Sequence, residues 1–131
     1  MSSKLHITEV GRVAIPAADQ DRSLEFYVDT LGFEVRADET FADGQMRWIE
    51  VAPPGGATAI AITPPMGDGP TAVDTGIIIS TEDIEADHET LNAAGVDVDP
   101  EISRMGAPVP PMFRLRDPSG NGLTVVEPLQ G

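Results

Sequence analysis

The chain has 131 residues and a formal net charge of −14, from 22 acidic and 8 basic side chains. A surface this acidic repels phosphate backbones and anionic membranes, which excludes nucleic acid and membranes as expected partners. The chain contains no cysteine, which also excludes disulfides, thiolate metal sites and cysteine nucleophiles.

The length is that of one domain, and we treat residues 1–131 as a single unit. The sequence contains no run of 18 apolar residues and does not start with a signal-peptide pattern, so we expect a cytoplasmic protein. The acidic balance has two interpretations that both remain open. It is either a solvated surface, as in salt-adapted proteins, or a means of attracting a cationic ligand.

An internal repeat organises the chain. Aligning Asp19 with Asp83 superposes a strand-like segment and a following helix in each half. The two halves then differ by one residue. Gly32 follows the first helix and Gly95 follows the second, but Gly95 comes one residue sooner after Asp83 than Gly32 comes after Asp19. We predict a duplicated βαβββ unit, with module one at about residues 6–65, a linker at about 64–74 and module two at about 75–128.

In the first module we predict a strand, a helix and three strands, at about 10–16, 19–31, 33–41, 46–52 and 58–63. The helix has signals at both ends, because Asp19 can cap its free amides and Gly32 can adopt the left-handed conformation that ends it. Its apolar residues recur at helical spacing: Leu24, Tyr27, Val28 and Leu31.

The second module repeats this order, with a strand, a helix and three strands at 75–80, 83–94, 96–102, 111–116 and 123–127. The segment DPSGNG at 117–122 predicts a hairpin turn between the last two strands. The Pro/Gly-rich segment 103–110 predicts a loop over one end of the sheet.

Two segments carry a resemblance to a known family. VAIPAADQDRSLEFYVDTLGFEV at 13–35 and FRLRDPSGNGLTVVEP at 113–128 resemble the opening and the closing hairpin of vicinal oxygen chelate proteins. This superfamily includes glyoxalases, bleomycin-resistance proteins and extradiol dioxygenases. The resemblance implies an α+β fold in which two tandem βαβββ modules form curved mixed sheets around a shared cavity. It also implies a homodimer, either domain-swapped or side by side.

Metal-using members of the superfamily place His, Glu or Gln at one position in the first and last strand of each module. The matching positions here hold Arg12, Ala61, Gly76 and Thr124. None of these is a usual metal ligand, and the permanent charge of arginine repels a divalent ion. We therefore expect neither a metal nor another cofactor.

Strand alternation assigns the two faces of each sheet independently of the resemblance. If those four positions face the cavity, every helix-facing position is apolar: Val13, Ile15, Ile60, Ile62, Ile77, Ile79, Leu123 and Val125. A shift by one residue would destroy this pattern. The candidate ligand-binding residues on the cavity side are Arg12, Trp48, Glu50, Ile78, Met112, Arg114 and Thr124.

Several of these residues also have a purely structural interpretation. Arg12 and Glu50 can pair with each other across neighbouring strands, Arg114 can lie in a dimer interface, and Trp48 can serve packing alone. We expect His88 to pack at the edge of the helix–sheet core, away from the cavity. Two cavity arginines against one glutamate favour a ligand with an anionic or hydrogen-bond-accepting group.

Two classes of function remain. The first is a bleomycin-resistance-like protein that binds a small organic ligand in the cavity without a metal ion. The second is an enzyme of the superfamily, a lyase, isomerase or dioxygenase, with displaced metal ligands or a cofactor-free mechanism based on Arg12 and Glu50. The sequence identifies no catalytic residue and no specific ligand.

Overall fold

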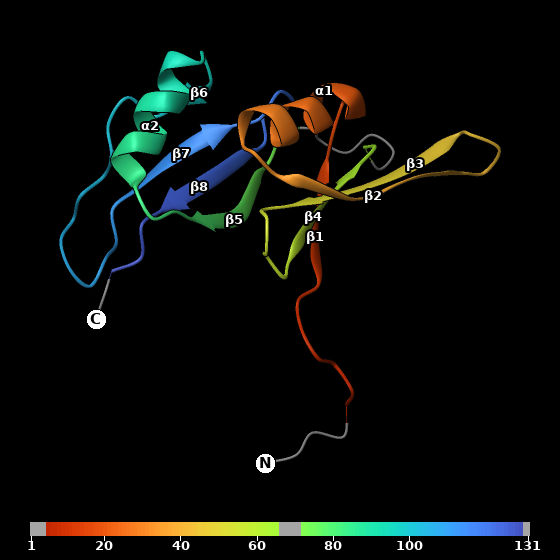
Figure 1. Ribbon diagram of the computed structural model, residues 1–131, viewed down its shortest axis with the longest axis horizontal. Helices are drawn as coiled ribbons and strands as arrows, with labels where there is room; N and C mark the ends of the chain where they lie inside the picture. Colours follow the sequence, from red (N-terminus) through yellow and green to blue (C-terminus); the bar gives the residue numbers. More distant parts are fainter. Residues whose placement is uncertain (1–4, 66–71, 130–131) are drawn as a thin grey trace.

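The computed structural model describes residues 5–65 and 72–129 and contains two βαβββ modules (Figure 1). Module one consists of β1 (Arg12–Pro16), α1 (Gln20–Glu25), η1 (Phe26–Thr30), β2 (Glu34–Phe41), β3 (Met46–Ala52) and β4 (Ala59–Thr63). Module two consists of β5 (Asp74–Ser80), α2 (Ile84–Ala93), β6 (Asp97–Val98), β7 (Met112–Arg116) and β8 (Gly122–Val126). The predicted α+β class and the duplication are confirmed. Part of the predicted linker, residues 66–71, lies outside the described residues.

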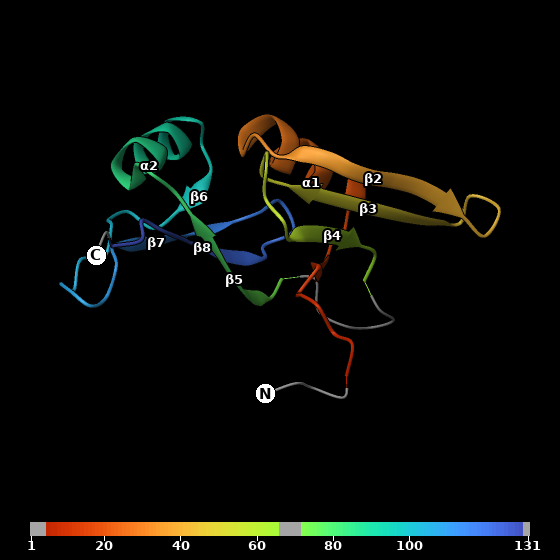
Figure 2. The same ribbon diagram turned by 60° about the horizontal axis from the view of Figure 1, so that its bottom comes forward.

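Each module forms its own mixed sheet of four strands. The strand orders are β1-β4-β3-β2 and β5-β8-β7-β6, and in both sheets the first strand pairs in parallel with the last. Figure 2 shows both helices on the same side of the two sheets, so that no helix of residues 5–65 and 72–129 covers the opposite faces. We call these uncovered faces the open faces.

The helix ends follow the sequence signals. Asp19 accepts a hydrogen bond from the amide of Arg22 at 3.2 Å, and Asp83 caps α2 in the same way. Gly32 and Gly95 end the two helices with φ values of 77° and 81°, a conformation that favours glycine.

The first helix differs from the predicted uniform α-helix. After Glu25 it widens into the π-helical turn η1, in which the amide of Leu31 donates to the carbonyl of Phe26, five residues earlier. The wide turn places Tyr27 in the core, where its ring packs edge-on against Phe26 and tilted against Phe33. Helical periodicity located the buried face but carried no signal for the extra residue in the turn.

The strand predicted at 96–102 is much shorter in the structure, and β6 has only two residues. Pro100 has no amide to donate to a ladder, and the side chain of Asp99 takes the place of a strand partner by accepting from the amide of Arg114 at 3.1 Å. Pairing resumes only at an isolated bridge between Ser103 and Met112.

The alternation of the strands is as predicted. Seven of the eight helix-facing residues are buried or partly buried within one core cluster, and the eighth, Val13, is partly buried outside it. Ile49, Val51, Phe113 and Leu115 are at most 1% exposed, which leaves Trp48, Glu50, Met112 and Arg114 on the open faces. His88 packs against the ring of Phe113 at the core edge, as predicted, with ring centroids 4.9 Å apart.

A buried polar cluster joins the two modules. The Tyr27 hydroxyl of module one donates to Oδ2 of Asp117 in the turn of module two, at 2.9 Å. Asn121 Nδ2 donates both to Asp117 Oδ2 at 3.0 Å and to the carbonyl of Pro16 at 2.7 Å. The amides of Ser119 and Asn121 donate to the other oxygen of Asp117 at 2.9 Å each. The predicted turn at 117–122 therefore also locks module two onto module one.

Neither α-helix in the described part of the chain is long and apolar enough to cross a membrane.

Replacing Tyr27 with Phe should lower the free energy of unfolding by about 1–3 kcal/mol, because it leaves the buried carboxylate of Asp117 without one of its donors. Urea denaturation monitored by circular dichroism measures the change. A loss below about 0.5 kcal/mol, the range of an ordinary surface substitution, would contradict this role of the hydroxyl.

The same cluster predicts a pH dependence. Burial is the main cause that raises the pKa of Tyr27, and the charge and hydrogen bond of Asp117 raise it further. The neutral phenol therefore stabilises the fold below the ordinary tyrosine pKa of about 10, and this contribution is lost as the pH rises above it. Because Tyr27 is the only tyrosine, phenolate absorbance at alkaline pH should appear only together with unfolding. Phenolate formation in the still-folded protein would refute this expectation.

Candidate functional site

The open face of module one carries a cluster built on β1 and β3. Arg12 Nε lies 3.1 Å from Glu50 Oε1, and Trp48 Nε1 donates to Glu50 Oε2 at 2.6 Å. Ala59 and Ala61 on the intervening β4 are buried, and their small side chains leave space on this face for the longer ones. The pairing of Arg12 with Glu50 is one of the two interpretations that the sequence left open.

Glu50 is held as a carboxylate. The hydrogen bond from Trp48 is the main cause that lowers its pKa, and the hydrogen bond and charge of Arg12 lower it further, against the opposing effect of burial. The side chain of Glu50 is 13% exposed, whereas that of Arg12 is 56% exposed. A molecule lying on this face would therefore meet the guanidinium of Arg12 and the indole of Trp48 before the carboxylate.

The open face of module two carries a second cluster around Arg114. Its Nη2 atom lies 2.9 Å from Asp74 Oδ1. The guanidinium occupies space that Gly122 leaves free, because a Cβ atom on Gly122 would lie 2.7 Å from Nη2. Arg114 Nε is buried and has no hydrogen-bond partner among the described residues. Thr124 is the strand neighbour of both Arg114 and Ile78, and the Ile78 side chain is among the most exposed apolar ones, at 64%.

Asp74 was not among the predicted site residues. The predicted positive excess rested on two arginines and one glutamate, but in the structure Arg12 pairs with Glu50 and Arg114 pairs with Asp74. A signal was present, because the alternation that assigns Ile78 to the open face includes Asp74 four residues earlier. The predicted positive excess on the open faces is correspondingly smaller.

The seven candidate residues form two groups rather than one. Arg12, Trp48 and Glu50 belong to the sheet of module one, and Ile78, Met112, Arg114 and Thr124 belong to that of module two. Strand pairing places Met112 opposite Val126 and Arg114 opposite Thr124, beside each other on one face. The hydrogen bonds and ion pairs described above hold each group within its own module.

The residues at the family's metal positions do not fit a divalent ion. Arg12, Ala61, Gly76 and Thr124 offer neither an imidazole nor a carboxylate. The backbone is also altered at Gly76, which has a φ of 72° within an irregularity of the β5–β8 pairing. An L side chain is strained there, so a histidine or glutamate is disfavoured as well as absent. In the ranges 5–65 and 72–129, no three His, Asp or Glu side chains converge as metal ligands do.

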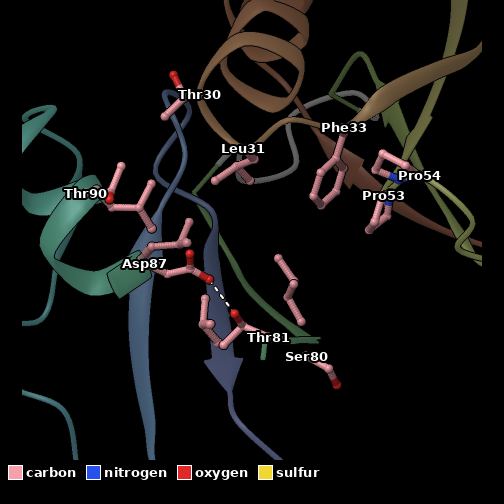
Figure 3. Close-up of a pocket in the computed structure, with 13 residues that line it drawn as sticks. Thr30, Leu31, Phe33, Pro53, Pro54, Ser80, Thr81, Asp87 and Thr90 are labelled. Atoms are coloured by element: carbon pink, nitrogen blue, oxygen red, sulfur yellow. Dashed lines mark hydrogen bonds between the residues drawn. The ribbon is translucent and has the colours of Figure 1, made fainter. Parts of the chain in front are cut away.

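Two hollows lie along the seam between the modules. The arginines of the two clusters line neither of them, although Ala59 and Ile78 line the second. One has a volume of about 230 Å³ and the other about 260 Å³. They share four lining residues, Phe33 and Pro53 of module one and Ile79 and Ser80 of module two. Figure 3 shows the first hollow, with α2 on one side and Leu31, Phe33, Pro53 and Pro54 on the other. No sequence pattern predicted these hollows, because they depend on how the modules are placed relative to each other.

Comparison with known proteins gives consistent matches over nearly the whole chain. A structure from Sphaerobacter thermophilus DSM 20745, a member of the glyoxalase/bleomycin resistance protein/dioxygenase superfamily, is 36% identical with a TM-score of 0.85, covering 94% of this chain and 99% of that one. TnmS3, an antibiotic binding protein from Streptomyces sp. CB03234, is 29% identical with a TM-score of 0.80, covering 95% of this chain and 99% of that one.

The sequence comparisons agree with the structural ones. The protein YetH of Bacillus subtilis (strain 168) is 31% identical over 100 residues, which is 76% of this chain and 82% of YetH. The family described as Glyoxalase/Bleomycin resistance protein/Dioxygenase superfamily matches residues 9–125. The resemblance inferred from the two sequence segments is thereby confirmed, and the chain belongs to the glyoxalase/bleomycin resistance protein/dioxygenase superfamily.

Proposed function

We propose that this protein binds a small organic molecule on its open faces without a metal ion. The observation that carries the proposal is the replacement of the family's metal positions by a binding surface of a different kind. Arg12 there forms an ion pair with Glu50, which also accepts a hydrogen bond from Trp48. The left-handed backbone conformation at Gly76 disfavours a ligand side chain. An indole and exposed guanidinium groups beside small or apolar side chains are typical of sites for amphipathic molecules.

The chemistry of the two clusters suggests the class of ligand. Trp48 offers a ring for stacking, and the side chain of Arg114 remains 40% exposed beside its carboxylate partner. A guanidinium has five N–H donors and Asp74 engages only part of this set, so Arg114 can still donate to a ligand oxygen. We expect an aromatic or amphipathic molecule with a hydrogen-bond-accepting group. The similarity to TnmS3, an antibiotic binding protein, supports a ligand of this kind.

The enzymatic alternative receives less support from the site. A general base works best when its pKa lies near the working pH, whereas Trp48 and Arg12 lower the pKa of Glu50. Glu50 is thus a weak base at neutral pH. Its bonds to Arg12 and Trp48 suit it to orienting those two side chains rather than to moving a proton.

Substituting Arg114 with Met should weaken the binding of the best ligand by about ten-fold, because the side-chain volume is kept while a charged hydrogen-bond donor is removed. The ligand is found by a thermal-shift screen of aromatic and amphipathic compounds, and its affinity is then measured by isothermal titration calorimetry, which detects binding to either open face. Trp48 is the only tryptophan, so its fluorescence reports separately whether the ligand contacts module one's open face.

The matched control is Arg104→Met, which removes an exposed arginine that is paired with Glu85 in a loop outside both clusters. This variant should bind like the original protein. Unchanged affinity in Arg114→Met, or an equal loss in both variants, would refute the assignment of Arg114 to the site.

We also propose a symmetric homodimer. Phe41, Met46 and Ile78 are 50%, 42% and 64% exposed, and each sheet has an edge strand that a second copy can cover. Light scattering at micromolar concentration should report twice the monomer mass of 13.8 kDa. A monomer at these concentrations would contradict the proposal.

A further inference from the structure

The hollow shown in Figure 3 has a polar rim with one negative charge. Thr30 comes from the end of η1, Thr81 follows β5, and Asp87 and Thr90 lie on α2. The hydroxyl of Thr81 donates to Asp87 Oδ2, which fixes the orientation of the carboxylate. The remaining lone pairs of Asp87 stay available to a further donor, and among the described residues no lysine or arginine lines the hollow.

The inner wall of the same hollow is apolar. Leu31 and Phe33 contribute from module one, and Leu91, Leu115 and Val125 from module two. The adjoining hollow continues this surface with Val13, Ile60 and Ile77, and no charged residue of the part of the chain that the structure describes lines it. The seam therefore has a carboxylate at one end and an apolar passage leading away from it.

The surrounding charges favour a cation at the rim. Arg36 approaches the seam, where its Nη2 donates to the carbonyl of Pro53, but Glu34 neutralises it through an ion pair of 2.9 Å. Asp83, which caps α2, lies one helical turn before Asp87. With a net charge of −14 on the chain, the long-range field acts in the same direction as these local groups.

We infer that the seam is a second binding site, separate from the open faces, which takes a small primary amine with an apolar tail. The ammonium group binds Asp87 with Thr81 and Thr90 close by, and the tail lies between Leu31 and Leu91. A volume of about 230 Å³ limits the ligand to a small molecule, and the adjoining hollow can take a longer tail. Among the open-face residues, Ala59 and Ile78 line only the adjoining hollow, and Arg12, Trp48, Glu50 and Arg114 line neither, so the amine site at Asp87 does not rest on the proposed function.

The experiment uses three probes with the same tail and different head groups: hexylamine, hexanol and hexanoate. Hexylamine is protonated at neutral pH, since alkyl ammonium groups titrate near pH 10. NMR titration should show saturable shifts of the methyl signals of Leu31, Ile79 and Leu91 with hexylamine. Hexanol should bind more weakly, and hexanoate should cause no saturable shift. Shortening the tail should weaken binding by about four-fold for each methylene removed.

The decisive variant is Asp87→Asn, which keeps an oxygen that can accept from Thr81 and removes only the charge. It should weaken hexylamine binding by about ten-fold and leave hexanol binding unchanged. Glu89→Gln is the matched control, because it makes the same change of charge on an exposed residue of α2 that does not line the seam. This control should bind hexylamine like the original protein.

Trp48 fluorescence and the Arg114→Met variant separate this site from the open faces. Hexylamine should leave the fluorescence unchanged and should bind Arg114→Met normally, whether or not an open-face ligand is found. The inference is overturned if hexylamine does not bind, if Asp87→Asn and Glu89→Gln behave alike, or if the shifts centre on Trp48 instead of Leu91.

Discussion

The carboxylate of Asp117 is the group on which the relation between the two modules depends. It is 5% exposed and accepts hydrogen bonds from the Tyr27 hydroxyl, from the Asn121 side chain and from two amides of its own turn. The sheets are separate, and the elements with the most extensive contacts lie within one module. A buried carboxylate with several donors tolerates little displacement, because every hydrogen bond that it loses leaves part of its desolvation cost uncompensated. The position of the seam hollows thus follows from a turn that lies outside both of them.

Strand alternation was sufficient to predict the faces of both sheets. Once Ile49 and Phe113 are assigned to the core, the neighbouring Trp48 and Arg114 must lie on the opposite face of their sheets, and the structure places them there. Alternation does not say which polar groups meet on a face. That depends on register, on space and on irregularities such as the one in β5, so the pairing of Arg114 with Asp74 escaped prediction. The hollows at the seam were not predicted for a related reason, since no local sequence pattern encodes the placement of one module against another.

The family's metal positions differ in ion pairing and backbone conformation as well as in donor atoms. At Arg12 an always-protonated side chain is committed to Glu50, and at Gly76 the backbone adopts a conformation that suits glycine. Restoring a metal site would require replacing these side chains and also rebuilding part of β5. The two open faces instead carry two separate arginine–carboxylate pairs. The two modules are alike in architecture but differ in the arrangement of their charged side chains.

The π-helical turn η1 lies where the two halves of the chain differ in length. The first helical segment, Gln20–Thr30, is one residue longer than its counterpart, Ile84–Ala93, although both begin after a capping aspartate and end before a left-handed glycine. This is the same one-residue offset that the alignment of the two halves requires. The first helical segment accommodates the additional residue internally, in the π-helical turn, and not in a loop. The extra residue widens the turn that contains Tyr27, so the difference in length between the two halves lies beside the contact that joins the modules.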